Sequence, residues 1–118
     1  MEKLFLAAML CWAVGSCEDK QAAKAAPFEA DARWVNALPY DGCYWHFEVS
    51  QGDSVVNFSP TSGSIAAIER VAGLMNEVSG PVDVHIKYQP TGQKQKVTCG
   101  WGHTALYDEV EIIDIARR

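Results

Sequence analysis

Strict alternation of apolar and polar residues is the feature of this sequence that most limits its fold. In residues 82–88, Val82, Val84, Ile86 and Tyr88 alternate with three polar or charged residues. Successive side chains of a β-strand point to opposite faces, so this period of two predicts a strand that is buried on one face. The chain is therefore expected to be mainly β.

Four further segments have the composition and spacing of strands, namely residues 42–49, 54–59, 94–101 and 110–116. Turn residues at 51–53 and 90–92 separate neighbouring segments. In the last segment the adjacent Ile112 and Ile113 interrupt the alternation, which predicts a β-bulge or a strand that is covered on both faces.

One helix is predicted between the second and third of these strands. Apolar residues recur there at steps of three and four, as on one side of a helix: Ile65, Ile68, Ala72, Met75 and Val78. Ser62 or Ser64 can cap its start, and Gly80-Pro81 ends it. The resulting order, ββαβββ, predicts a small, partly open, five-stranded, OB-like barrel. The alternative is an α+β fold in which the helix packs on a single antiparallel sheet.

Composition and charge exclude several classes of protein. A chain of 118 residues, 48% of them hydrophobic, fits one globular domain. Ten basic and 15 acidic residues give a net charge of -5, so the basic surface that nucleic acids require is missing. The sequence contains neither a nucleophile-elbow motif nor a dinucleotide-binding loop. We therefore predict no nucleic-acid partner, no catalytic residue and no cofactor.

The first residues predict export and lipidation. Residues 4–14 are uncharged and apolar, but the run is shorter than the roughly 20 residues of a membrane-spanning helix. It follows Lys3, as the apolar core of a secretory signal does. It ends in Val14-Gly15-Ser16-Cys17, which resembles the lipobox of bacterial lipoproteins. The resemblance implies that signal peptidase II cuts before Cys17, whose sulfur and new amino group carry acyl chains. The alternative is an ordinary cleaved signal peptide.

This resemblance divides the chain into three parts. They are a cleaved lipoprotein signal peptide (1–16), a lipidated tether (17–39) and a β-rich globular domain (40–118). Residues 18–32 are rich in alanine and charged residues and lack alternation, which is typical of a tether. Residues 31–38 can form a short helix before Pro39.

The same resemblance places the protein in the bacterial cell envelope, attached to the membrane through its lipid anchor. The domain would face the periplasm or the exterior. Glu18 stands after the lipidated cysteine where inner-membrane retention would favour aspartate, so we expect the outer membrane rather than the inner one.

The domain itself also resembles small, uncharacterised lipoproteins of Bacteroidota-type bacteria. The resemblance rests on Gly42-Cys43, on 84–88, on Cys99-Gly100 and on 110–115, and it covers residues 42–118. It implies no activity for this chain.

Two cysteines lie within the predicted domain. Alternation places Cys43 and Cys99 on the inward faces of their strands, and an oxidising compartment favours a disulfide between them. Free thiols are one alternative. The other is zinc, because these cysteines with His46 and His103 would make a tetrahedral site. The spacing of Cys43 and His46, however, puts them on opposite faces of a regular strand.

Tyr44, His46 and His85 are the candidate ligand-binding residues. All are predicted on outward faces of strands, where His46 and His85 could be neighbours. Exposed ring faces bind sugars, peptides or flat apolar groups, and six aromatic residues exceed what alternation needs for the core: Trp34, Tyr40, Tyr44, Trp45, Trp101 and Tyr107. Tyr44 is the best candidate among them, because its neighbours point inward, whereas Trp101 shares the inward face of Cys99. The competing interpretation is solvated surface for the histidines and packing under a loop for Tyr44.

These features predict a non-enzymatic binding or assembly module whose partner is an envelope protein or a small ligand. One alternative is a small metal-binding or enzymatic envelope protein that uses His46, His85 or His103. The other is a structural or inhibitory lipoprotein.

Overall fold

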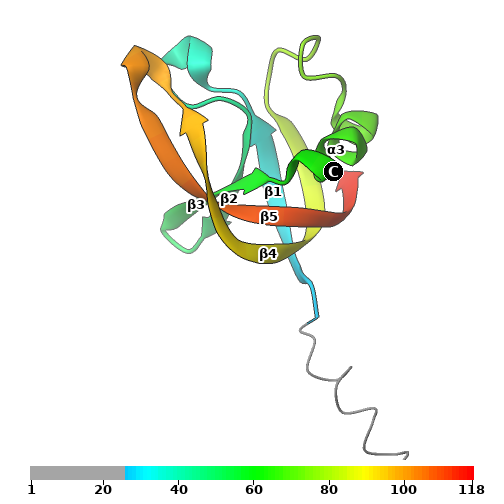
Figure 1. Ribbon diagram of the computed structural model, residues 1–118. Helices are drawn as coiled ribbons and strands as arrows, with labels where there is room; N and C mark the ends of the chain where they lie inside the picture. Colours follow the sequence, from blue (N-terminus) through cyan, green and yellow to red (C-terminus); the bar gives the residue numbers. More distant parts are fainter. Residues whose placement is uncertain (1–25) are drawn as a thin grey trace, which may run out of the picture.

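The computed structural model describes residues 26–118 and arranges them as a five-stranded β-barrel with one α-helix (Figure 1). The strands are β1 (Phe28–Val35), β2 (His46–Gln51), β3 (Ser54–Pro60), β4 (Val82–Thr98) and β5 (Thr104–Arg117), and the helix is α3 (Ile65–Ala72). The predicted signal peptide, Cys17 and the first part of the tether lie outside the described residues. No helix within 26–118 is long and apolar enough to cross a membrane.

The strands close into a barrel in the order β1-β2-β3-β5-β4, with β4 pairing back onto β1. All neighbours are antiparallel except β3 and β5, which run parallel over Phe58–Pro60. A closed sheet of this order with a helix between β3 and β4 is consistent with a small OB-like barrel. The predicted fold class is confirmed, although the barrel is closed rather than partly open, and the single open sheet is wrong.

The order of elements along the chain is βββαββ, not the predicted ββαβββ. One strand, β1, was not expected. The predicted strands 82–88 and 94–101 are largely the two halves of β4, which continues through the expected turn at 90–92. The register with β5 shifts between Pro90 and Lys94, so the turn residues are accommodated as an irregularity within one curved strand (Figure 1).

β1 occupies a segment that was expected to be tether. It pairs with β4 from Phe28 to Trp34, and Ala32 and Trp34 are buried in the core. The predicted helix over 31–38 is therefore wrong, and only the short 3-10 turn η1 (Leu38–Tyr40) follows β1. The barrel thus includes residues from Phe28 on, ahead of the domain start that was predicted near Tyr40.

α3 ends at Ala72 instead of near Gly80. Gly73 has a φ of 101°, and a Cβ at this position would lie 2.5 Å from Cγ2 of Val78. Ile68 and Ala72 are fully buried, while Val78 packs against the core from the loop after the helix. The apolar residues predicted on one side of the helix thus pack against the core, but Met75 and Val78 do so from the loop after α3 and not from the helix.

The serines before α3 do not cap it with their side chains. Ser64 Oγ instead accepts a hydrogen bond from the backbone N–H of Ile112, at 2.9 Å, and contacts Oγ1 of Thr61 at 2.8 Å. Ser64 therefore joins the start of α3 to β5.

The bulge predicted in the last strand is confirmed. Lys87 pairs with Asp114 and Tyr88 with Ile112, so Ile113 has no partner opposite it in β4. Ile112 is buried while Ile113 is 50% exposed. The extra residue lets β5 keep apolar side chains on the core face before and after the bulge.

Candidate functional site at the disulfide end of the barrel

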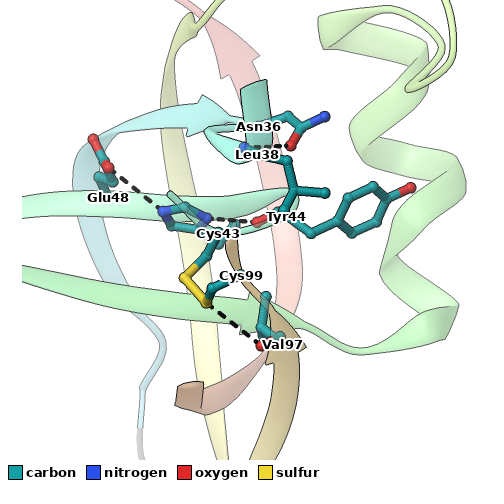
Figure 2. The surroundings of a disulfide bond; sticks show 8 residues. Asn36, Leu38, Cys43, Tyr44, Glu48, Val97 and Cys99 are labelled. Atoms are coloured by element: carbon teal, nitrogen blue, oxygen red, sulfur yellow. Dashed lines mark hydrogen bonds and ion pairs between the residues drawn. A yellow bond between two sulfur atoms is a disulfide. The ribbon is translucent and has the colours of Figure 1, made fainter. Parts of the chain in front are cut away.

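A disulfide joins two loops at one end of the barrel (Figure 2). Cys43 precedes β2 and Cys99 follows β4, and the two residues, 56 apart in sequence, also form an isolated β-bridge. The predicted disulfide is confirmed, so neither sulfur is a thiolate that could bind zinc. Within the described part of the chain, no three His, Cys, Asp or Glu side chains are grouped to hold a metal ion.

Backbone hydrogen bonds hold the same two loops together. The N–H of Gly100 donates to the carbonyl of Gly42 at 2.9 Å, and the N–H of Tyr44 donates to the carbonyl of Thr98 at 2.8 Å. The approach is close because Gly100 has no side chain: a Cβ there would lie 2.8 Å from Cα of Asp41. The two loops therefore pack against each other through their backbones and form one unit.

Three aromatic side chains project from this unit. Tyr40, in η1, is 81% exposed, and Trp101, in the 3-10 turn η3 (Gly100–Gly102), is 83% exposed. Tyr44 is 44% exposed. We call residues 36–45 and 99–103 the aromatic loops. Large rings on constrained loops offer contact area with little loss of conformational entropy on binding.

The aromatic loops lie at the end of the barrel opposite to the start of β1. Figure 1 shows the described chain entering at Phe28 and running along β1 toward the loops that carry η1 and η3. A strand of this length spans roughly 25 Å, at about 3.3 Å per residue. Whatever precedes Phe28 is therefore attached far from the exposed rings.

His46 is buried, so the expectation that it faces solvent is wrong. Only 3% of it is exposed, because the ring of Tyr107 packs over it with 5.1 Å between ring centroids. Its Nδ1 lies 2.6 Å from the carbonyl oxygen of Tyr44, and its Nε2 lies 3.4 Å from Oε2 of Glu48 (Figure 2). A carbonyl can only accept, so Nδ1 carries the proton and holds the backbone of Tyr44 in place.

His85 is separated from His46 and belongs to a cluster of charges between β4 and β1. His85 Nδ1 lies 2.8 Å from Oδ1 of Asp31, and Nε2 lies 3.0 Å from Oε1 of Glu29. His85 pairs with Asp31 whereas His46 pairs with Val35, four residues further along β1. The two histidines are therefore not neighbours as predicted.

The charge cluster changes the acid–base properties of its members. Hydrogen bonds to Glu29 and then to Asp31 raise the pKa of His85 above its ordinary value. The hydrogen bond from His85 is also the main cause that lowers the pKa of each carboxyl group, with Lys87 helping at Glu29 and Arg118 at Asp31. Charged His85 donates from both ring nitrogens and so links β4 to β1.

A cavity of about 320 Å³ opens beside Tyr44, and we call it the Tyr44 cavity. Its wall includes Trp34, Tyr44, Trp45, Met75, Gln95 and Val97. A wider groove of about 820 Å³ runs along β1 and β2 and is lined by charged residues, among them Glu29 and Asp31 of the charge cluster. The Tyr44 cavity adjoins the aromatic loops. Its wall combines aromatic and aliphatic side chains with polar ones, namely Ser59, Ser62, Gln95, Lys96 and Thr98.

Of the predicted site residues, the structure brings Cys43, Cys99, Tyr44 and His46 together and leaves His85 apart. His103 lies after η3, where it is exposed and its carbonyl accepts from the N–H of Cys99. The sequence placed Tyr40 and Trp101 among the aromatic residues in excess of the core, but it favoured Tyr44 as the binding residue and put Trp101 on an inward face, which is wrong. The available signal was an aromatic residue between turn-forming residues next to each cysteine, in Pro39-Tyr40-Asp41-Gly42 and Gly100-Trp101-Gly102.

Removing the disulfide should destabilise the barrel strongly. We expect Cys43→Ala/Cys99→Ala to lower the free energy of unfolding by about 4 kcal/mol. The cross-link closes a long loop and so reduces the number of conformations open to the unfolded chain. Denaturant titration of oxidised wild type and the double variant measures this difference. Equal unfolding midpoints would show that the bond contributes nothing.

A methyl group at Gly100 should separate the aromatic loops. Gly100→Ala is expected to cost roughly 1–3 kcal/mol of stability, because its Cβ meets the backbone of Asp41 rather than a flexible side chain. Gly63→Ala is the matched control, since nothing lies within 4 Å of a Cβ at that position. Thermal unfolding compares the two variants, and equal melting temperatures would contradict the close packing.

The stabilising effect of His85 should depend on pH. The raised pKa of His85 means that its contribution is present below about pH 6.5 and disappears as pH rises through the folded-state value. The pKa values of Glu29 and Asp31 are lowered. Their contribution to the free energy of unfolding is therefore present above about pH 4.5 and disappears in stronger acid.

His85→Gln should therefore lower stability most between about pH 4.5 and 6.5. The effect should fall as pH rises through the raised pKa of His85 and as it falls through the lowered pKa values of Glu29 and Asp31. Denaturant titrations across this range measure the difference from wild type. His103→Gln is the control, because His103 forms no ion pair in the described part of the chain. A difference for His85→Gln that does not change with pH would overturn the assignment.

Comparisons with known proteins found no matching protein family, no matching curated protein and no matching solved structure. No identity or activity is therefore transferred from a relative. The function is inferred from the geometry of residues 26–118 together with the lipobox-like sequence that ends at Cys17.

Proposed function

We propose that this protein is a non-enzymatic binding module of the bacterial cell envelope, held to the membrane through a lipid on Cys17. It binds its partner with the aromatic loops. The observation that carries the proposal is the high exposure of Tyr40 and Trp101 on two loops that a disulfide and backbone hydrogen bonds fix together. Exposed rings of this kind are concentrated at binding surfaces.

The direction of the chain supports this arrangement. A lipid at Cys17 attaches the barrel at the side of Phe28, and the aromatic loops lie at the other end (Figure 1). A membrane-anchored barrel can therefore present Tyr40 and Trp101 away from the bilayer. Two or three acyl chains give the stable anchoring that this role requires, since each buried methylene adds about 0.8 kcal/mol of membrane affinity.

The contacts of His46 and His85 hold parts of the barrel together. His46 is committed to the carbonyl of Tyr44, and His85 to two carboxylates. His46 therefore holds the backbone of Tyr44, and His85 links β4 to β1 through side chains.

The proposal is tested with the full chain produced in a bacterium with its own signal sequence. The intact mass of wild type purified from membranes should show a chain that starts at Cys17 and carries acyl groups, whereas Cys17→Ser should show none. The anchor is refuted if the two proteins differ only by the substitution.

Binding is tested in the same membranes with a photo-crosslinking phenylalanine analogue at Trp101. We expect it to form discrete products with an envelope component. The same analogue at Val55, which is 57% exposed near the turn between β2 and β3, is the matched control. Identical products from both positions would contradict a binding surface on the aromatic loops.

A further inference from the structure

β1 and β2 pair over a short stretch and then separate. Their register ends at Arg33 opposite Glu48. Beyond this pair β1 continues to Phe28 and β2 to Gln51, and in residues 26–118 no strand pairs with either of them on this side. The groove of about 820 Å³ lies along this opening, and we call it the β1–β2 groove.

The backbone of β1 presents unpaired groups to this groove. In an antiparallel pair the N–H and C=O of one residue point to the same side, successive residues alternate, and two opposite residues point either toward or away from each other. The carbonyl of Asp83 accepts from the N–H of Arg118, which follows β5, so Asp83 points away from β1. His85 has the same orientation as Asp83, so Asp31 opposite it directs its N–H and C=O away from β4 and into the groove. The same holds for Glu29.

β2 offers a second open edge across the groove. Arg33 has the orientation of Asp31, so it faces Glu48 in the pair that ends the register. Ser50, two residues further along β2, therefore faces the groove as well. In residues 26–118, no loop or turn supplies a backbone partner to these open positions of β1 and β2. An extended peptide satisfies such donors and acceptors by adding a strand.

Charge indicates which peptide fits. Four carboxylates line the groove against two arginines, Arg33 and Arg118, and each arginine already contacts one carboxylate. Glu29 and Asp31 lie next to the open edge of β1, whereas their partner His85 lies on β4, on the other side of β1 from the groove. A strand added to β1 would have carboxylates as its nearest neighbours, and opposite charges stabilise such cross-strand pairs.

The floor of the groove is apolar. Ala30 and Ala32 lie between the charged residues of β1, and Val49 lines the groove from β2. Phe28 is 53% exposed and stacks on Tyr88, with 5.8 Å between ring centroids. Because the side chains of an added strand alternate, its apolar residues would pack on this floor while its basic residues lie beside the carboxylates.

We propose that an extended segment of a partner protein, with basic and apolar residues in alternation, adds as a strand to the open edge of β1 in the β1–β2 groove. The free stretch from Phe28 to Ala32 spans roughly 16 Å, at about 3.3 Å per residue, which matches a peptide of about five residues. This surface lies at the end of β1 away from the aromatic loops, so it is a second binding surface and does not depend on the first (Figure 1).

The test titrates the exported protein with the peptide acetyl-Lys-Val-Lys-Val-Lys-amide. The protein carries Cys17→Ser, so that it has no acyl chains. We expect the peptide to move the amide resonances of Glu29 and Asp31 in nitrogen-15 NMR spectra and to slow their exchange with deuterium, because these N–H groups then donate to the added strand. The acidic peptide acetyl-Glu-Val-Glu-Val-Glu-amide is the matched control and should bind roughly tenfold more weakly.

Two substitutions at Asp31 separate strand pairing from charge attraction. Asp31→Asn removes the carboxylate and keeps the N–H, whereas Asp31→Pro removes both. Proline suits an edge position whose N–H does not bond to the neighbouring strand, as holds for Asp31 toward β4. We expect Asp31→Pro to bind the lysine peptide roughly threefold to tenfold more weakly than Asp31→Asn, through the loss of one hydrogen bond. The titration of wild type does not depend on whether Asp31→Pro folds.

Equal affinities of the two Asp31 variants would show charge attraction without an added strand and overturn the proposal. Amides of Glu29 and Asp31 that the lysine peptide does not move would do the same. So would amides that exchange slowly before any peptide is added, because the edge would then not be open. Val55 lines the β1–β2 groove, so its crosslinks report on this surface and those from Trp101 on the aromatic loops. Failure of one surface therefore leaves the other untouched.

Discussion

The Cys43–Cys99 disulfide connects parts of the barrel that strand pairing does not. It ties the start of β2 to the end of β4, two strands that are not neighbours in the order β1-β2-β3-β5-β4. The bond therefore crosses the end of the barrel at which β1 terminates. Because the intervening chain contains β3 and α3, the cross-link also limits how far these elements can separate in the unfolded state.

Fixing two loops backbone to backbone requires small residues and leaves large ones outside. Gly42 and Gly100 lie at the contact: a Cβ on Gly100 would clash with Asp41 of the other loop, and a Cβ on Gly42 would clash with Ala37 of its own loop. Tyr40 and Trp101 stand within two residues of these glycines, and their rings are exposed to solvent. The close backbone contact and the exposed rings therefore belong to the same two short segments.

Sequence reasoning recovered features that depend on local pattern and missed those that depend on neighbouring strands. The alternation in 82–88, the bulge at Ile113 and the disulfide were all predicted correctly. β1 was missed because its inward positions include Ala30 and Ala32, which give little hydropathic contrast. His46 was expected outside, because no local pattern reveals that Tyr107 of β5 covers it. The end of α3 depends on a close contact between Gly73 and Val78 that periodicity does not show.

β1 makes different kinds of contact at its two ends. Near Phe28 it meets β4 through Glu29, Asp31 and His85, whose attraction depends on protonation and is open to solvent. Near Val35 it contributes Trp34, whose indole ring stacks on that of Trp45, and neither ring carries a titratable group. A change of pH therefore acts on the contacts of β1 near Phe28, where the attraction between the charge cluster's side chains depends on protonation, and not on the stacked indole rings near its other end.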